Sequence, residues 1–259
     1  METVVDFAGP SEGAVHITHT DYAGLMKDIE TALQTQAGFA LATLNLDHIV
    51  KLRRDRAFRA AYLVQTHVVA DGNPIIWLSR QAGRPVELIP GSELVIPLAQ
   101  MATRLGLPVA FLGSTAETLN TTEQALQAQC PGLEIICKIA PTYGFDPSGD
   151  AAASALSDIA ASGAALCFLA LGAPKQEILA ARGLKLAPHC GFVSIGAGLD
   201  FIAGTQTRAP QWVRSLALEW VWRMLSNPRR LAGRYMACIA ILPGLIRTAR
   251  RARNAPAQQ

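Results

Sequence analysis

Six short apolar runs, each followed by a segment with helical spacing of apolar residues, constrain the fold of this chain more than any other feature. Most of these runs lack the polar alternation of half-exposed strands, which indicates strands that are buried on both faces. Buried strands separated by helices predict a parallel sheet covered by helices on both sides, in an α/β fold. The predicted strands span residues 39–45, 67–70, 108–112, 133–139, 165–171 and 191–195.

Capping residues mark where several helices between these strands begin and end. Asp47 is expected to cap one helix that runs to about residue 64, and the pair Asn73-Pro74 to begin another. Gly106 is expected to end the helix that follows residues 90–92. The body of the sequence has no internal repeat or flexible linker, so we expect one domain over residues 1–205 and a helical appendage over residues 206–259.

Composition excludes several other classes of protein. Half of the residues are apolar and 17% are charged, which is unlike a disordered chain. The five cysteines are scattered and odd in number, which predicts reduced, buried thiols and no disulfide framework or cysteine zinc site. The first residues do not resemble a signal peptide, and the longest apolar run, residues 236–246, is interrupted by Pro243 and too short to cross a bilayer.

The carboxyl ends of parallel strands lie at one edge of a sheet, and ligands of open α/β sheets bind along that edge. Small residues follow these strand ends, where backbone N–H groups can approach a nucleotide or a diphosphate. Ordinary turn chemistry explains the same composition, so both interpretations stay open at this point. The candidate binding residues at this edge are Asn45, Gly72, Gly113, Ser114, Gly172, Lys175 and Gly198.

Asp71 is the sharpest single candidate for chemistry, because it lies between a strand end and a Gly-Asn-Pro turn. A carboxylate there can act as a general base on a sugar hydroxyl, although capping the turn is the commoner role. Thr43 ends the neighbouring strand, where it can orient a substrate or bond its own backbone. The sequence has no D-x-D pair for a metal–diphosphate bridge, and residues 196–201 lack the third glycine of a dinucleotide fingerprint.

Positive charge is concentrated at the carboxyl end of the chain. Residues 208–259 contain ten arginines, no lysine and one acidic residue, a formal charge of +9, whereas residues 1–207 carry −6. Trp212, Leu216 and Trp220 lie on one face of a predicted helix, and Asn227-Pro228 begins a second helix. Arginine and tryptophan around an apolar segment suit an anionic membrane surface. The alternative is a helical hairpin docked on the core or on a sister subunit, and nucleic acid ranks last because the segment is apolar and lacks lysine.

Five stretches resemble the WecG/TagA/CpsF family of bacterial glycosyltransferases. They are TLNLDHIVKLRRD at residues 43–55, VVADGNPIIWLSR at 68–80, PGSEL at 90–94, LGAPKQE at 171–177 and GAGLDFIAGTQTRAPQWVRSLALEWVWRMLSNPRRLAGRY at 196–235. Leu88 departs from the family pattern, because many members have an arginine at that position. An arginine there could bind the carboxylate of a uronic acid, so this departure disfavours a uronic-acid donor.

The resemblance implies a single Rossmann-like α/β domain with a basic C-terminal appendage. It also implies an inverting, metal-independent transferase that needs no cofactor and moves a hexose or N-acetylhexosamine from a UDP-sugar to a polyprenyl-diphosphate-linked saccharide. Such enzymes act peripherally at the cytoplasmic face of the bacterial plasma membrane, in the synthesis of exopolysaccharide or teichoic acid-like polymers. Carried over by position, Asp71 is the base, Thr43, Gln176, Arg223 and Arg230 complete the catalytic set, and Arg208 joins the UDP-binding residues.

Two other functions compete with this interpretation. An epimerase or dehydrogenase acting on a nucleotide sugar would need a dinucleotide loop that the sequence lacks. A non-catalytic, membrane-associated assembly protein on a Rossmann-like scaffold would bind no UDP-sugar and would tolerate replacement of Asp71. The donor sugar, the acceptor saccharide, the polymer and the formation of a homo-oligomer are left open by the sequence.

Overall fold

The protein is described by a computed structural model that covers residues 14–207, 210, 222 and 228–254 of the chain. Within these residues the centre of the molecule is one sheet of six strands in the order β2-β1-β6-β5-β3-β4, and every neighbouring pair is parallel. This confirms the predicted parallel α/β fold. The strands are β1 Ala40–Leu44, β2 His67–Ala70, β3 Val109–Gly113, β4 Ile135–Ile139, β5 Leu166–Ala170 and β6 Gly191–Ser194.

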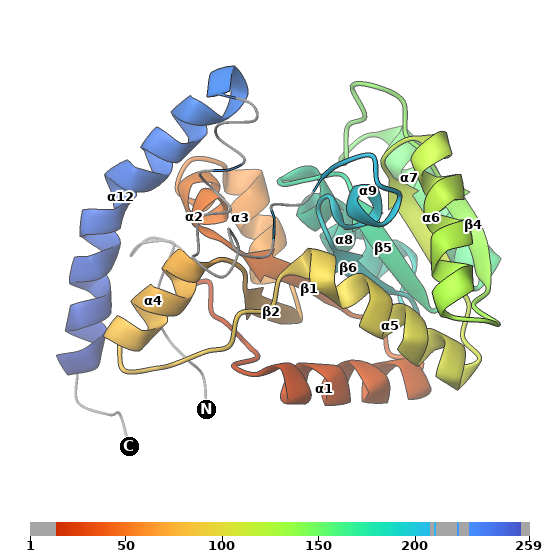
Figure 1. Cartoon of the computed structure of the whole chain (residues 1–259), viewed down its shortest axis with the longest axis horizontal. Helices are drawn as coiled ribbons and strands as arrows, with labels where there is room; N and C mark the ends of the chain where they lie inside the picture. Colours follow the sequence, from red (N-terminus) through yellow and green to blue (C-terminus); the bar gives the residue numbers. More distant parts are fainter. Residues whose placement is uncertain (1–13, 208–209, 211–221, 223–227, 255–259) are drawn as a thin grey trace.

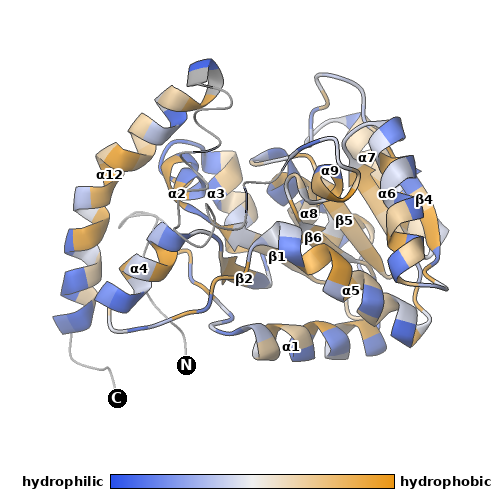
Figure 2. Ribbon diagram, viewed as in Figure 1, coloured by the Kyte–Doolittle hydropathy of each residue, from blue (hydrophilic) through white to orange (hydrophobic). Residues whose placement is uncertain are grey.

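Helices cover both faces of the sheet, as the buried strands require (Figure 1). Their bounds are α1 Tyr22–Gln34, α2 Leu46–Leu52, α3 Arg56–Leu63, α4 Asn73–Gln81, α5 Gly91–Leu105, α6 Ala116–Gln129, α7 Asp150–Ser162, α8 Lys175–Leu186, α9 Gly198–Ile202 and α12 Pro228–Asn254. Helices α1, α5, α6 and α9 share one apolar cluster with the sheet, and α7 and α8 share another on the opposite face. Figure 2 shows the apolar strands inside these polar-surfaced helices.

The segment between β1 and β2 differs from the single helix that the sequence predicts. Asn45 caps α2 by accepting a hydrogen bond from the backbone N–H of His48 at 3.0 Å, and Asp55 caps a separate helix, α3, through Phe58 at 3.0 Å. Asp47 therefore lies inside α2 and caps nothing. A short polar side chain that binds backbone N–H groups offers a new helix start wherever it occurs, and Asp55 divides the expected helix in this way.

Helix α12 begins at Pro228, as Asn227-Pro228 predicts, and runs through Pro243. It lies against α2 and α4 and places Leu245 and Ala249 in a cluster with apolar residues of β1, β2 and α2–α4 (Figure 1). The second helix of the tail is therefore docked on the body. The predicted stripe at residues 212–220 lies outside the described residues, and the division of the chain at residues 205/206 stays a prediction.

Two further expectations about the chain can be compared with the structure. All five cysteines are free and most are buried, which confirms reduced thiols without a disulfide framework. Among the described residues, none of the helices combines the length and the apolar character that a membrane crossing requires.

Candidate functional site

Thr43 and Asp71 meet at the carboxyl edge of the sheet. Strands β1 and β2 pair with Leu44 beside Ala70, and the backbone N–H of Asp71 donates to the carbonyl of Leu44 at 2.8 Å. The Thr43 hydroxyl donates to the Asp71 carboxylate at 3.4 Å. Thr43 is buried and Asp71 is half-buried, so a carboxylate held by its neighbour faces the edge where ligands of parallel sheets bind.

Helix α5 begins directly over this pair, a proximity that the sequence did not reveal. A Cβ atom on Gly91 would lie 2.8 Å from the Ser194 carbonyl and 3.1 Å from Cγ2 of Thr43, so the close approach requires glycine. The N-terminus of α5, the positive end of its helix dipole, therefore lies beside β1 and β6. The PGSEL stretch contains this glycine, but only the tertiary structure places it next to Thr43.

Gln176 joins the turns that follow β5 and β6. Its side chain is 3% exposed, and its Oε1 accepts hydrogen bonds from the backbone N–H groups of Gly172 at 3.2 Å and Gly196 at 3.1 Å. Two turns that are distant in sequence are thus held by one amide oxygen. The predicted site residues Gln176 and Gly172 are therefore brought together, with Gln176 fixing the backbone of the edge.

Glu177 holds the other end of the Gln176 amide. Nε2 of Gln176 donates to Oε1 of Glu177 at 2.9 Å, and Oε2 of Glu177 has no hydrogen-bonding partner among the described residues. Glu177 is fully buried, and loss of hydration raises the pKa of its carboxyl from 4.5 to about 7. A buried acid of this kind is a supporting residue that the sequence reasoning missed, although the GAPKQE stretch includes it.

His48 lies next to this carboxyl and is buried. Its Nδ1 is 2.8 Å from the Tyr62 hydroxyl, and its Nε2 is 4.0 Å from Oε1 of Glu177. Burial, with a smaller contribution from the nearby Lys51 charge, lowers the pKa of His48 to about 3, so the ring is neutral. The prediction that His48 lies on a helix surface is wrong, because packing turns that face of α2 toward α3 and α8.

The turn after β3 is held by a contact that the sequence did not indicate. Gly113 has φ +128°, and a Cβ there would lie 2.3 Å from the Ala170 carbonyl, so β3 and β5 converge on glycine. Ser114 adopts φ +54°, and its hydroxyl donates to Oδ1 of Asp200 in α9 at 2.7 Å. In this structure the Ser114 hydroxyl is thus directed at Asp200, which belongs to the GAGLDF stretch.

The remaining predicted binding residues occupy several positions around the edge. Gly72, with φ +102°, is the N-cap of α4 next to Asp71, and Lys175 is the first residue of α8. Gly198 begins α9, where a Cβ would lie 3.0 Å from Val95, so the glycine serves close packing. Asn45 caps α2, as described above.

The three predicted arginines cannot be placed at the site. Arg208 and Arg223 lie outside the described residues, and so does the side chain of Arg230, whose backbone belongs to α12.

A different arginine of the tail, Arg234, reaches the body. Its Nε donates to Oδ1 of Asp47 at 2.9 Å, while Nζ of Lys51 donates to Oδ2 of the same carboxylate at 2.6 Å. Lys51 also donates to the carbonyl of Ala173 at 3.1 Å, in the turn after β5. This network connects α12 through α2 to the turn that Gln176 holds.

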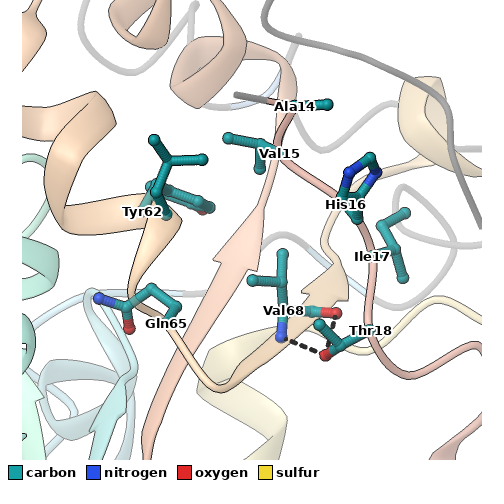
Figure 3. Close-up of a pocket in the computed structure, with 9 residues that line it drawn as sticks. Ala14, Val15, His16, Ile17, Thr18, Tyr62, Gln65 and Val68 are labelled. Carbon is teal, nitrogen blue, oxygen red and sulfur yellow. Dashed lines mark hydrogen bonds between the residues drawn. The ribbon is translucent and has the colours of Figure 1, made fainter. Parts of the chain in front are cut away.

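A pocket of about 260 Å³ lies elsewhere in the molecule, and none of the candidate site residues whose side chains the structure describes lines it. It is formed by residues 14–18 together with Tyr62, Leu63, Gln65 and Val68 (Figure 3). Thr18 hydrogen-bonds with Val68 at its margin, so the pocket borders the outer strand β2. The chemistry of the Thr43–Asp71 edge therefore belongs to a surface distinct from this pocket.

One comparison with known proteins identifies the chain over nearly its whole length. The sequence model described as "Glycosyl transferase WecG/TagA/CpsF family" matches residues 13–255.

Proposed function

Because the chain belongs to the WecG/TagA/CpsF family of glycosyltransferases, we propose that it transfers a hexose or an N-acetylhexosamine, with inversion, from a UDP-sugar to a polyprenyl-diphosphate-linked saccharide. The observation that carries this proposal is the Thr43–Asp71 pair, with a hydroxyl–carboxylate distance of 3.4 Å at the ligand-binding edge of the sheet. Inverting transfer needs one base beside the acceptor hydroxyl, and Asp71 provides a carboxylate at that edge.

In the proposed reaction the acceptor hydroxyl oxygen attacks the anomeric carbon of the donor as the bond to the UDP oxygen breaks. Asp71 takes the hydroxyl proton, and UDP departs with the bonding electrons. Thr43 orients the Asp71 carboxylate through its hydroxyl. Gln176 holds the turns at Gly172 and Gly196 together through their backbone N–H groups. In this proposal the two turns form part of the wall around the nucleotide.

Departing UDP gains negative charge that the protein must stabilise. The absence of a D-x-D pair from the sequence supports a metal-independent route. The N-termini of α5 and α8, the latter with Lys175, bring the positive ends of two helix dipoles to the edge. We propose that Arg208, Arg223 and Arg230 complete this positive environment when the acceptor binds. The remaining binding residues, Asn45, Gly72, Gly113, Ser114 and Gly198, then shape the edge around the nucleotide.

A donor screen with a short-chain polyprenyl-diphosphate acceptor, in the presence of EDTA, tests the reaction. Asp71→Asn should lower turnover by about 10²–10⁴-fold while UDP-sugar binding persists. Asp158→Asn, an exposed change in α7, is the matched control and should keep wild-type turnover. Near-wild-type transfer by Asp71→Asn would leave Asp71 a turn residue, and a protein that binds no UDP-sugar would be better described as a non-catalytic assembly protein.

We further propose that the protein acts peripherally at the cytoplasmic face of the bacterial plasma membrane, with the outer side of α12 toward the lipid. That side exposes Met236 (65%) and Ile239 (50%), and Arg247 and Arg250 are exposed on the same helix. Apolar side chains beside arginines favour an anionic bilayer surface.

Flotation with vesicles that contain anionic lipid measures this association. The double change Met236→Asp and Ile239→Asp should reduce vesicle binding several-fold, because it places charges where apolar side chains would insert. Tyr143→Asp is the control, since Tyr143 is fully exposed in the loop that follows β4. Equal binding by the double variant and the control would contradict the proposed orientation.

A further inference from the structure

Three potential metal ligands meet at the amino end of β2, opposite the end that carries Asp71. His19 lies just before α1, Asp28 is in α1, and His67 is the first residue of β2. One ligand atom from each residue lies within 4.8 Å of the others. The two imidazole rings stack with centroids 4.8 Å apart and planes 7° from parallel, and Nε2 of His19 is 2.9 Å from Oδ2 of Asp28.

A threonine hydroxyl lies against Nδ1 of each imidazole. The Thr18 hydroxyl is 2.9 Å from Nδ1 of His19, accepts the Val68 N–H at 2.8 Å and donates to the Val68 carbonyl at 3.3 Å. A hydroxyl has only one proton to donate. When the Thr18 hydroxyl donates that proton to the Val68 carbonyl, its oxygen can only accept a hydrogen bond from the imidazole of His19. In that tautomer Nδ1 of His19 carries the hydrogen and Nε2 presents a lone pair, which is the state in which the ring can bind a metal ion.

The same arrangement surrounds His67. The Thr66 hydroxyl is 2.8 Å from Nδ1 of His67, accepts the Ala40 N–H at 3.0 Å and donates to the Ala40 carbonyl at 3.1 Å. In the corresponding tautomer Nδ1–H of His67 donates to this hydroxyl, and Nε2 is left with a lone pair. Metal-binding histidines are commonly held in this way, with the second ring nitrogen donating to an oxygen that fixes the ring.

In the metal-binding tautomer the lone pair on Nε2 of His19 faces a carboxylate oxygen of Asp28 at 2.9 Å. Two acceptors at that distance repel each other unless a cation lies with them. A proton on Nε2 would join only these two atoms, whereas a metal ion would also use the lone pair of His67. We propose that His19, Asp28 and His67 form a binding site for a divalent transition-metal ion of the zinc class.

The geometry and the ligand types agree with zinc. Because the three ligand atoms lie within 4.8 Å of one another, some point lies within about 2.8 Å of all of them, and side-chain rotations that tilt the stacked rings toward that point reach the 2.0–2.2 Å of zinc bonds. Two imidazoles and one carboxylate suit zinc, whereas magnesium and calcium prefer oxygen ligands. The side chain of Asp28 is 64% exposed, which leaves room for water as a fourth ligand.

The bound ion would have a structural role. Thr18 donates its backbone N–H to the Val68 carbonyl at 2.9 Å, so the segment before α1 runs along β2, a terminal strand of the sheet. An ion held by His19, Asp28 and His67 would tie this segment and α1 to β2. This proposal is independent of the proposed glycosyl transfer, because the cluster and Asp71 lie at opposite ends of β2.

Titration calorimetry with Zn²⁺ on the metal-stripped full chain, free of any histidine tag, tests the site. The wild type should bind one ion, and His19→Gln and Asp28→Asn should each weaken binding by about 100-fold or more, since each loses a ligand. His189→Gln is the matched control, because His189 is exposed and lies outside the cluster. Both test positions are close to the surface, so these variants should fold.

Two further measurements separate this site from the alternatives. Co²⁺ should give a visible absorption spectrum of nitrogen and oxygen ligands in the wild type, without thiolate bands, and this spectrum should be lost in both variants. Zn²⁺ should raise the melting temperature of the wild type and of His189→Gln, and should leave that of the two variants unchanged. Equal Zn²⁺ affinity in the wild type and both variants would overturn the proposal and leave a protonated histidine–aspartate pair.

Discussion

Replacing Glu177 with glutamine is expected to stabilise the protein above neutral pH and to change its stability little in acid. Glu177 is fully buried, and its pKa is raised from 4.5 to about 7 because the ionised carboxylate loses its hydration. Between these two values the folded protein keeps a proton that the unfolded chain has released. The free energy of unfolding therefore falls as pH rises from about 4.5 to about 7.

The size of this effect follows from the pKa difference. At about 1.4 kcal/mol for each unit of pKa, the buried carboxyl costs roughly 3 kcal/mol once the pH exceeds 7. Glutamine carries no charge and keeps an oxygen that can accept the Gln176 amide, a bond of 2.9 Å in the wild type. The stability of Glu177→Gln relative to the wild type should thus increase by roughly 3 kcal/mol between acid and alkaline pH.

Urea unfolding followed by circular dichroism, at several values between about pH 5 and pH 8, measures this difference. His48 adds its own pH dependence, because its pKa is lowered to about 3 and the stability it contributes is lost as pH falls below 6.5. Both proteins contain His48, so this contribution largely cancels in the difference. Glu117→Gln, an exposed change in the first turn of α6, should show a difference that stays constant within about 0.5 kcal/mol. A constant difference for Glu177→Gln as well would refute the reasoning.

Two other predictions concern packing at the site and in the tail. Gly91→Ala should lower the free energy of unfolding by roughly 1–3 kcal/mol, because its Cβ would lie 2.8 Å from the Ser194 carbonyl. Gly233→Ala, a change in α12 where the new Cβ would meet no other described part of the protein within 4 Å beyond the helix's own backbone, should be neutral or slightly stabilising in the same denaturation assay. Leu245→Asp should release α12 from the body and speed limited proteolysis, because Leu245 is buried under that helix. Ile239→Asp, on the exposed side of the same helix, should leave proteolysis unchanged; equal cleavage of the two variants would contradict the docking.

The sequence predicts helical structure between β1 and β2 correctly, but it predicts one helix where the structure has two, α2 and α3. Asn45, Asp47 and Asp55 are all short polar residues that can cap a helix, and local sequence does not rank them. The structure uses Asn45 and Asp55, and it leaves Asp47 to pair with Lys51 and Arg234. The partner Arg234 lies nearly two hundred positions away in the sequence, so no local pattern could indicate that pairing.

The same limit applies to the candidate site. Apolar runs and glycine-rich turns are local signals, and they predicted the parallel sheet correctly. They also placed Asp71 and Thr43 at the carboxyl edge of that sheet, where the structure has them. Whether Thr43 touches Asp71 depends on β1 pairing with β2, which is a long-range choice. The catalytic and binding roles of these residues stay predictions.

The sequence by itself determined which segments form strands. Five of the apolar runs form fully buried strands, because a continuous apolar run is stable when both of its faces are covered, whereas the terminal strand β4 alternates partly buried and exposed residues. It also located the positive charge of the tail and the residues that follow each strand. Tertiary structure decided the strand order, the contact of Gly91 with the Thr43 edge, the burial of Glu177 beside His48, and the meeting of His19 with His67. These contacts arise when distant segments pack together. Burial then changes the pKa and the hydrogen bonding of side chains such as Glu177 and His48, and local sequence carries no signal of that burial.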